Sequence, residues 1–342
     1  MISEKQISKI RDELRHCKRP IFFFHDDPDG LASFLLLYRY IKEGKGVVIK
    51  THPRITTMFL RKVEEYGADK IFVLDIAIVD QDFIDQAKVP VIWIDHHEPL
   101  ERTNVIYINP RTEGKNIPPS YVCYKVTEKD IWIAMAGCIG DWYMPDFKAQ
   151  FCKEYPGLMD DSISRPEEAL FNTRLGELIK IMSFNLKGKT QDVMKSAKVL
   201  TRIENPNEVL NQTSSRGRFI YKRYEKVKKF YDELLKKALK KRAKDRILLF
   251  AYRHDKLSLT KELANELLYR FPDNVVVIAR EKAGEMKCSL RAGEKIVLTG
   301  ILERALAGIE GYGGGHEHAC GAVIKKEDFK QFIKNLKSEL KG

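Results

Sequence analysis

Short apolar runs that end on charged residues constrain the fold of this chain more than any other feature. Ile21 to His25, Ile71 to Asp75 and Val91 to Asp95 each read as a strand of this kind, and Leu31 to Ile41 reads as a helix between the first two. Strands that alternate with helices predict a mostly parallel sheet with helices on both faces. Ligands of such sheets collect at the carboxyl ends of the strands, where these charged residues lie.

The rest of the sequence predicts two further parts, because 342 residues are too many for one ordinary core. Helical patterns dominate after about residue 119, and a second alternation of strands and helices begins near Arg246. We therefore predict an N-terminal α/β domain at 1–145, a helical insert with a basic connecting helix at 146–245, and a smaller C-terminal α/β domain at 246–342.

Positive charge is concentrated in one segment. Of the net charge of +12, the segment from Arg216 to Arg246 carries +10, with 14 Lys and Arg against 4 Asp and Glu. Such an excess is typical of a surface that binds a polyanion, and also of a solvated lysine-rich helix. Within it, apolar residues from Ile220 to Ala238 recur at helical spacing. This seam predicts packing on another helix, within the chain or across a homo-oligomer interface.

The sequence argues against other classes of protein. Six cysteines are scattered without a CxxC pair, so neither a zinc knuckle nor a redox dithiol is expected. The longest apolar runs, such as Ile131 to Ile139, are too short to span a bilayer. Residues 1–18 form a charged amphipathic pattern without the apolar centre of a signal peptide. We expect a cytoplasmic protein that does not bind membranes.

Four sequence elements carry candidate chemistry. They are His25-x-Asp27-x-Asp29-Gly30, Asp75, Asp95-His96-His97, and Asp141 after Gly137-Cys138-Ile139-Gly140. Carboxylates gathered at one sheet edge repel each other, and divalent cations remove that cost. Carboxylates with imidazole suit Mn²⁺, whereas oxygen-only sites suit Mg²⁺ better. Two such ions can share a carboxylate and stabilise the charge that develops at phosphorus during hydrolysis.

Each element alone also has a structural interpretation. The aspartates of the first element can cap a helix that begins near Leu31, and Asp75 can cap another. The pair His96-His97 directly after an apolar strand is the most specific local signal. The interpretation as a metal site therefore depends on all four elements occurring in order.

In these four elements the chain resembles the DHH phosphoesterase superfamily, whose name is spelled by Asp95-His96-His97. The resemblance implies two divalent metal ions, Mn²⁺ or Mg²⁺. The ligands that it implies are His25 and Asp27 for one ion, Asp29, His96 and Asp141 for the other, and Asp75 as the bridge. It further implies that His97 lies beside the scissile phosphate, as general acid or phosphate ligand. Asp95 would orient the histidines.

The C-terminal part resembles the DHHA1 domain of the same superfamily. Gly313-Gly314-Gly315-His316 looks like its glycine-rich signature, and Ser289-Leu290-Arg291 looks like the strand whose arginine grips substrate phosphate. Consecutive glycines form a loop that lets backbone amides approach a phosphate, and arginine offers a two-pronged, permanently charged contact. A glycine run alone would more simply indicate a flexible loop.

The spacing of the first element resembles RecJ-type nucleases, in particular their archaeal branch, rather than family II pyrophosphatases. This implies an exonuclease on single-stranded DNA or RNA that releases nucleoside monophosphates, with 3′→5′ polarity, in DNA repair, replication or RNA turnover. The basic segment would bind the trailing strand, and 146–245 would dock a helicase or a replication or repair protein. Asp26 is an additional carboxylate inside the first element.

Two alternatives remain. The same motifs occur in phosphoesterases of short substrates, namely nanoRNases, cyclic-dinucleotide phosphodiesterases and phosphatases of 3′-phosphoadenosine 5′-phosphate. Only the concentrated charge favours longer substrates. A non-enzymatic subunit of a replication or repair complex is the other alternative, but such members lose metal ligands and this chain has the whole set.

Overall fold

The computed structural model describes residues 2–50, 54–255 and 257–340. The chain forms two compact units, Met1–Tyr224 and Glu225–Gly342, which are described separately. Both units are α/β, which confirms the predicted fold class. The division falls within one long helix, α12 (Ser215–Ala238). None of the helices in the described parts of the chain is long and apolar enough to cross a lipid bilayer.

The first unit is built on a parallel sheet of five strands in the order β2-β1-β4-β6-β7. These strands are β1 (Pro20–His25), β2 (Lys45–Ile49), β4 (Lys70–Leu74), β6 (Val91–Ile94) and β7 (Ile106–Ile108). The chain passes from β1 to β2 on one side and then crosses to β4 on the other side. The order therefore reverses between β1 and β4, which is where parallel sheets bind their ligands.

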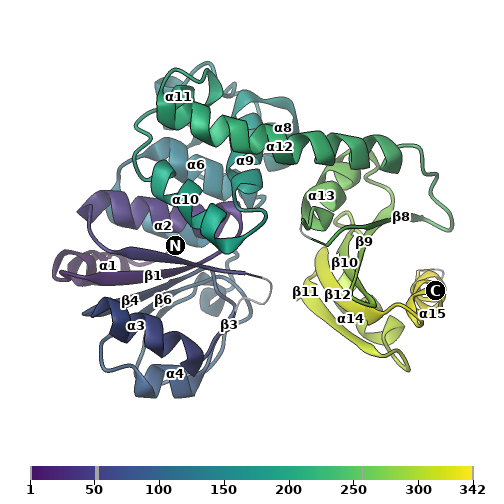
Figure 1. Ribbon diagram of the computed structural model, residues 1–342, viewed down its shortest axis with the longest axis horizontal. Coiled ribbons are helices and arrows are strands. Elements are labelled where there is room, and N and C mark those ends of the chain that lie inside the picture. The colour runs from purple at the N-terminus through teal and green to yellow at the C-terminus, as the bar shows by residue number, and fades with distance from the viewer. Residues whose placement is uncertain (1, 51–53, 256, 341–342) are drawn as a thin grey trace. The chain divides into compact units, whose positions relative to one another are not determined.

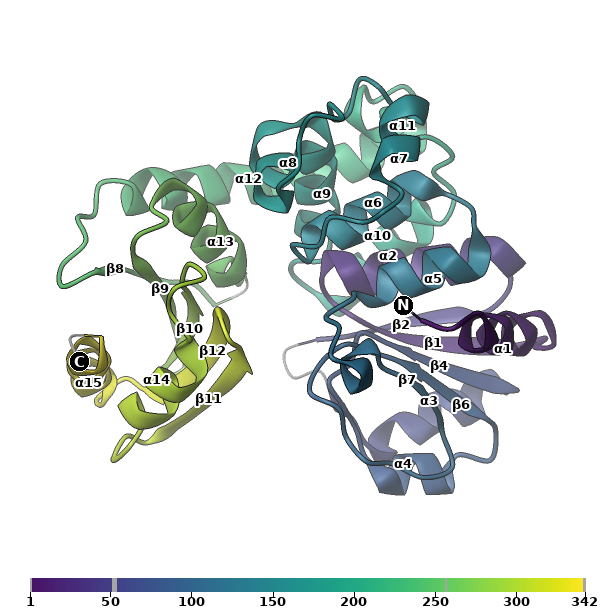
Figure 2. The same ribbon diagram turned by 180° about the vertical axis from the view of Figure 1, so that it is seen from behind.

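Helices cover both faces of this sheet, which explains why its strands are almost continuously apolar. Figures 1 and 2 show α2 (Pro28–Ile41) and α5 (Pro119–Thr127) on one face, and α3 (Leu60–Tyr66) and α4 (Gln81–Gln86) on the other. Packing between layers is partly aromatic: the rings of Phe24 and Phe34 stack with centroids 4.7 Å apart. The first unit also contains α1 (Glu4–Arg15), the short 3₁₀ helices η1 (Thr57–Phe59) and η2 (Pro110–Glu113), and a two-stranded sheet of β3 (Arg54–Ile55) and β5 (Ile78–Val79).

A second layer of helices packs above α2. Its members are α6 (Ile131–Gly140), α7 (Lys148–Glu154), α8 (Pro166–Asn172), α9 (Arg174–Asn185), α10 (Thr190–Leu200) and α11 (Pro206–Leu210). Two glycines let α6 approach α2 closely: a Cβ added at Gly137 would lie 2.6 Å from the Cβ of Ala32, and one added at Gly140 would lie 2.6 Å from that of Pro28. This contact brings Asp141, the C-cap of α6, to the N-terminal end of α2.

The apolar seam of α12 is buried by helices of the same chain. All six seam residues are at most 6% exposed: Ile220, Tyr224, Val227, Tyr231, Leu234 and Ala238. In the first unit the ring of Tyr224 packs against Phe184 of α9, with centroids 5.6 Å apart. In the second unit the hydroxyl of Tyr231 donates a hydrogen bond to Glu266 of α13 (Thr260–Arg270). The seam thus contacts helices within the chain.

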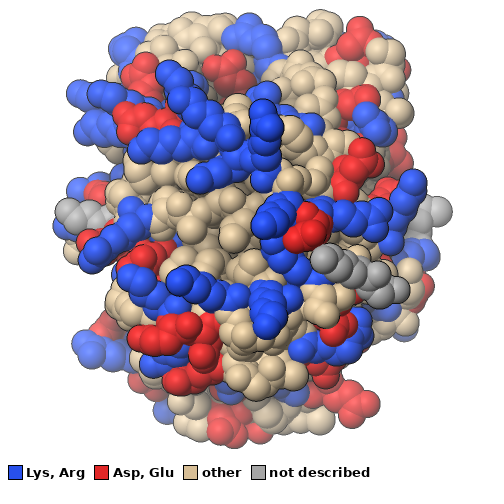
Figure 3. Space-filling view, turned by 90° about the vertical axis from the view of Figure 1, so that its right-hand side faces the viewer, with Lys and Arg blue, Asp and Glu red and all other residues tan. Residues whose placement is uncertain are grey.

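The basic residues of α12 and of the following segment lie on the outside. Lys236, Lys237, Lys240 and Lys241 are exposed, as are Arg242, Lys244 and Arg246. Figure 3 shows lysine and arginine side chains across the upper and middle parts of the face toward which α12 runs, with acidic side chains among them. Within the segment after α12, Asp245 is paired with Lys337 at 3.1 Å. Along α12 the seam is therefore buried while Lys236 and Lys237 are exposed, as the sequence pattern predicts.

The second unit contains a mixed five-stranded sheet in the order β11-β12-β10-β9-β8. Its strands are β8 (Ile247–Arg253), β9 (Val275–Lys282), β10 (Glu285–Arg291), β11 (Gly311–His316) and β12 (Ala319–Lys325), of which only β8 and β9 pair in parallel. The core lies between one face and the helices α14 (Leu298–Ala305) and α15 (Phe329–Glu339). Helix α13 packs on the opposite face, against β9 and β10.

The glycine run is a strand, and its prediction as a loop was wrong. Gly313, Gly314 and Gly315 lie within β11, the edge strand that pairs with β12. The physical reason is close packing rather than intrinsic strand propensity. A Cβ at Gly311 would lie 2.6 Å from the carbonyl oxygen of Val323, and one at Gly315 would lie 2.4 Å from that of Ala319. Glycine therefore lets β11 lie against β12.

Candidate active site

The first element of the site is the turn between β1 and α2. His25 is the last residue of β1, and Asp27 caps α2 by accepting a hydrogen bond from the backbone N–H of Gly30 at 3.0 Å. Gly30 has to be glycine because an added Cβ would lie 2.6 Å from the carbonyl oxygen of His25. The ring Nδ1 of His25 is 3.1 Å from a carboxylate oxygen of Asp27 and 3.1 Å from one of Asp75.

Asp75 lies at the centre of the site, directly after β4. Its φ of 56° is in the left-handed region, which is unusual for a residue other than glycine. Its backbone N–H donates to the carbonyl of Ile94 at 3.0 Å, and the residue is only 1% exposed. One carboxylate oxygen faces His25, and the other is 3.5 Å from Nε2 of His96. Strained backbone of this kind persists where surrounding contacts determine it, commonly at functional sites.

Asp29 and Asp141 complete the set of carboxylates. Asp29, in the first turn of α2, is 1% exposed, and its Oδ1 accepts a hydrogen bond from the backbone N–H of Ser120 at 2.8 Å. Among the described residues, its second oxygen, Oδ2, has no hydrogen-bond partner. Oδ2 of Asp141 lies 3.6 Å from Nε2 of His96. A buried carboxylate oxygen without a hydrogen-bond donor is costly, and a bound cation would remove that cost.

The adjacent histidines are held by different residues. Asn116 contacts Nδ1 of His96 through its side-chain oxygen at 3.0 Å, so that Nε2 faces Asp75. The carboxylate of Asp95 holds His97 by two contacts. It accepts a hydrogen bond from the backbone N–H of His97 at 3.0 Å and contacts Nδ1 of the His97 ring at 2.8 Å. Sequence reasoning named Asp95 as the residue that orients the histidines and missed Asn116. No spacing signal identifies Asn116, because it lies in a loop 20 residues beyond His96.

These side chains form overlapping groups with the donor atoms of metal sites. In each group the potential ligand atoms lie within 4.8 Å of one another. The groups within the first unit are His25 with Asp27 and Asp75, Asp29 with Asp75 and His96, and Asp75 with Asp95 and His97. Asp75 is common to all of them. The first two groups share Asp75 in the way expected of a carboxylate that bridges two ions.

The pKa shifts of these groups follow from burial and from the closeness of the carboxylates to one another and to the histidines. Burial alone would lower the pKa of His25 and of His96, but neighbouring carboxylates raise both well above the usual value. Burial raises the pKa of Asp29 well above its usual value, and repulsion from Asp75 and Asp141 adds to this. Burial acts to raise the pKa of Asp75 as well, yet hydrogen bonds from the two histidines bring it below the usual value.

Two divalent cations fit this arrangement. The raised pKa values of His25, His96 and Asp29 favour the protonated forms of these groups when no cation is bound. Cations would replace those protons, since metal ligands bind in their deprotonated forms. Oxygen and imidazole nitrogen donors, with the unpartnered oxygen of Asp29 among them, are suited to hard or borderline divalent ions.

The predicted substrate residues of the second unit lie on β10 and β11, the two strands that flank β12. Arg291, at the end of β10, donates from Nε to the side-chain oxygen of Asn265 at 2.6 Å. The hydroxyl of Ser289 donates to that of Thr260 at 2.9 Å. Both partners belong to α13, and sequence reasoning missed them because a helix-to-strand contact leaves no local pattern. His316 ends β11, two strands away from Arg291.

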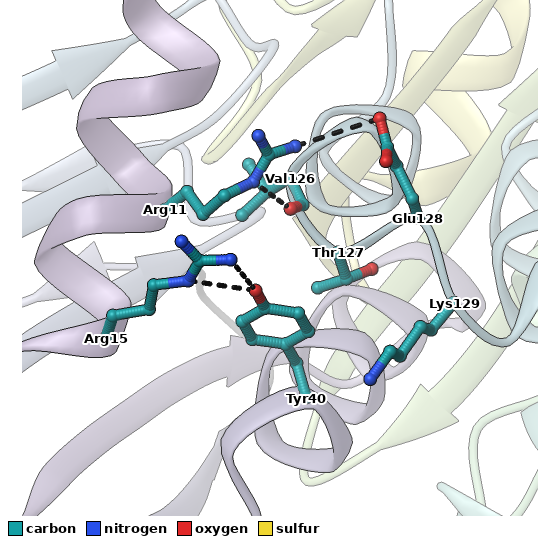
Figure 4. A pocket seen from close by; sticks show the side chains of 7 residues that line it. All are labelled: Arg11, Arg15, Tyr40, Val126, Thr127, Glu128 and Lys129. Atoms are coloured by element: carbon teal, nitrogen blue, oxygen red, sulfur yellow. Dashed lines mark hydrogen bonds and ion pairs between the residues drawn. The ribbon is translucent and has the colours of Figure 1, made fainter.

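A separate cavity of about 390 Å³ lies in the first unit between α1 and the ends of α2 and α5 (Figure 4). Arg11 closes one side by donating to the carbonyl of Val126 at 2.8 Å, and Arg15 donates to the hydroxyl of Tyr40. None of the predicted site residues lines it. Arg11 thus anchors α1 to carbonyls at the end of α5, and Arg15 anchors it to a side chain of α2, which accounts for the presence of both arginines.

Comparison with protein families identifies both units. The DHH family N-terminal domain matches residues 21–139, and the DHHA1 domain matches residues 233–342. The chain belongs to the DHH/DHHA1 superfamily. The candidate metal ligands of this DHH/DHHA1 protein thus lie within the DHH match except for Asp141, which follows it by two residues. No curated protein matches the sequence.

Solved structures show the same RecJ-like fold for the DHH/DHHA1 chain. RecJ from Thermus thermophilus in complex with Mn²⁺ is 15% identical, with a TM-score of 0.70 over 98% of this chain and 54% of that chain. A manganese-bound exonuclease RecJ is 13% identical, with a TM-score of 0.60 over 98% and 94%. The DHH domain of a member of a ribosomal protein family is 15% identical, with a TM-score of 0.67 over 98% and 90%. This chain spans about half the length of the Thermus protein.

Proposed function

We propose that this protein is an exonuclease that uses two divalent ions to remove nucleoside monophosphates from single-stranded DNA or RNA. The observation that carries the proposal is the pair of ligand groups that share Asp75 where the strand order reverses. The similar RecJ folds bound to Mn²⁺ and to Mg²⁺ support it. We assign His25 and Asp27 to one ion, and Asp29, His96 and Asp141 to the other.

The ions would neutralise charge on the scissile phosphoryl group and lower the pKa of a water molecule. The residues of the chain do the remaining work. Asp95 holds Nδ1 of His97 and thereby directs Nε2 away from itself. His97 is then oriented to donate a proton to the leaving oxygen or a hydrogen bond to the phosphate.

The DHHA1 unit would hold the end of the substrate. Arg291 offers a guanidinium to a phosphate, and its contact with Asn265 fixes the direction of that side chain. Ser289 and His316 add hydrogen-bonding groups, and Gly313, Gly314 and Gly315 let the chain approach closely. These assignments follow from the resemblance of the two sequence elements and from their place on a common sheet.

Finer features of the activity follow from donor chemistry, from charge and from the resemblance to RecJ-type nucleases. Mixed imidazole and carboxylate donors favour Mn²⁺ as the ion over Mg²⁺. The exposed lysines and arginines of 236–246 would bind the trailing strand through its phosphates. We propose 3′→5′ polarity, a role in repair, replication or RNA turnover in the cytoplasm, and docking of a helicase or repair protein on 146–245.

The test uses end-labelled dinucleotides and single strands of about 20 nucleotides, longer than one single-strand site usually covers. Both DNA and RNA are incubated with the protein and Mn²⁺ or Mg²⁺. Stepwise shortening of the long strand is expected, and the labelled end reveals the polarity. Cleavage of dinucleotides alone would replace the proposal with a short-substrate phosphoesterase. Absence of any hydrolysis with either ion would refute both.

A further inference from the structure

Glycine is required by close packing on one face of strand β11 but not on the other. Side chains alternate between faces along a strand. Gly311, Gly313 and Gly315 point toward the core side, where an added Cβ would meet atoms of β12 at 2.4 to 2.8 Å. Gly314 points the other way, and no described atom would lie within 4 Å of a Cβ added there. Close packing therefore explains why Gly311, Gly313 and Gly315 are glycines. It does not explain Gly314, where a larger side chain would fit.

Strand register places the proposed phosphate residues on this same outward face. Gly314 pairs with Gly321, and Gly321 pairs in turn with Ser289 of β10. One row further along, His316 pairs with Ala319, which pairs with Arg291. Residues opposite each other in paired strands share a face. The outward face thus runs from Ser289 and Arg291 across small residues to β11.

Tyr312 also lies on the outward face of β11, on the opposite side of Gly314 from His316. The residue is 55% exposed, so its ring is accessible to a ligand. Helix α13 covers the part of this face formed by β9 and β10, and its Thr260 meets Ser289 at the border. Beyond that border Gly321, Gly314 and Tyr312 are exposed. The result is an open strip with an aromatic ring at one end and Arg291 and His316 at the other.

We propose that Tyr312 stacks on the base of the terminal nucleotide, whose phosphate is held by Arg291. This inference rests on the proposed function and names the part of the substrate that the DHHA1 sheet recognises. A nucleotide joins a flat apolar base to a charged phosphate, and the strip offers an aromatic ring and a guanidinium on the same face. Stacking uses a surface that every base has, so the terminal base is bound without sequence preference.

The chemistry favours a nucleotide over an apolar peptide for this strip. A peptide added to the free edge of β11 would bind through backbone hydrogen bonds and would not need Arg291 on the outward face. A sugar phosphate alone would use Arg291 and leave Tyr312 without a role. Only a ligand with both a ring and a phosphate uses both ends of the strip.

The first test compares Tyr312→Ala and Tyr312→Phe on strands with a normal or an abasic terminal nucleotide. The alanine variant should lose about tenfold in kcat/KM on the normal strand, the typical value of one stacked base. It should lose little on the abasic strand, and Tyr312→Phe should recover most of the activity. Equal losses on both strands would overturn the proposal. Met58→Ala, which truncates another exposed apolar side chain, should not change the ratio between strands.

The second test does not depend on hydrolysis, so it separates failure of this inference from failure of the proposed function. Tyr312→Trp introduces a fluorophore on the strip, and the full-length variant is titrated with adenosine monophosphate and with ribose 5-phosphate. Saturable quenching by the nucleotide, beyond that of the unsubstituted protein, is expected. No quenching by the nucleotide, or equal quenching by the sugar phosphate, would overturn base stacking even if the enzyme degrades nucleic acid.

Discussion

The two units of the molecule handle charge in opposite ways. In the DHH unit, Asp29, Asp75 and His96 are at most 3% exposed and are fixed by hydrogen bonds to a neighbouring helix, strand and loop respectively. In the DHHA1 unit, the lysines after α12 are exposed, and the outward sheet face presents bare backbone and one aromatic ring. Buried charges interact strongly in a low dielectric, whereas exposed charges are screened by salt.

This difference indicates a division of labour. Burying several carboxylates together is unfavourable unless cations compensate for it, so the DHH unit is suited to hold the cations that the proposed chemistry at phosphorus needs. Exposed lysines and an open sheet face cost little in the free protein and suit a long, flexible, negatively charged ligand. Changes in the first unit should therefore be large and local, and changes in the second should be smaller and should depend on salt and substrate length.

The largest effect is expected at Asp75. Asp75→Asn keeps the size of the side chain, and asparagine tolerates the positive φ of this position. The change removes the charge shared by both ligand groups, so hydrolysis should fall by about a thousandfold or more, equivalent to several kcal/mol of lost transition-state stabilisation. Turnover is measured at saturating Mn²⁺, with circular dichroism as a check on folding.

Asp26→Asn is the matched control for that variant. Asp26 is next to His25 but belongs to none of the ligand groups found among the described residues. Its substitution should lower activity far less than that of Asp75. If Asp75→Asn retained turnover close to that of the unsubstituted protein, the assignment of Asp75 as the shared ligand would be wrong.

The next effect concerns the packing that supports the metal site. Gly30→Ala places a methyl group 2.6 Å from the carbonyl oxygen of His25. Alanine favours a helix over glycine by about 1 kcal/mol, but a clash of this kind costs about 1–3 kcal/mol and should dominate. The variant should unfold at lower urea concentration and bind Mn²⁺ more weakly. Gly157→Ala, with no described atom within 4 Å of the added methyl, should do neither. Equal stability of the two variants would contradict this account of Gly30.

The sequence predicted the DHH unit better than the DHHA1 unit for a physical reason. Parallel strands bring their carboxyl ends to one edge, so His25, Asp75 and His96 could be grouped from the order of their apolar runs alone. Asn116 could not be found, because its contact with His96 depends on the path of an irregular loop. Similarly, nothing in the sequence near Asp141 shows that two glycines of α6 bring it close to α2.

In the DHHA1 unit the informative contacts lie between elements rather than within them. A run of glycines has no strand propensity, so β11 looked like a loop until its pairing with β12 was known. Arg291 was identifiable by its resemblance to a motif, but its partner Asn265 lies on a different element. A role for Tyr312 could not be predicted from the sequence, because only the strand register shows that its ring lies on the same face as Arg291.

The smallest effect should come from the exposed lysines, and it distinguishes a local binding surface from net charge. Replacing Lys236, Lys237, Lys240 and Lys241 by glutamine should weaken binding of long single strands several-fold at moderate salt. Each lost phosphate contact should reduce the slope of log affinity against log salt by about 0.7. Cleavage of dinucleotides should be unchanged, because they are too short to reach a separate surface. A control variant changes the exposed lysines Lys5, Lys9, Lys62 and Lys153 of the first unit and alters the net charge equally. If both variants weakened long-strand binding equally, overall charge would account for the effect and the lysines of 236–241 would have no special role.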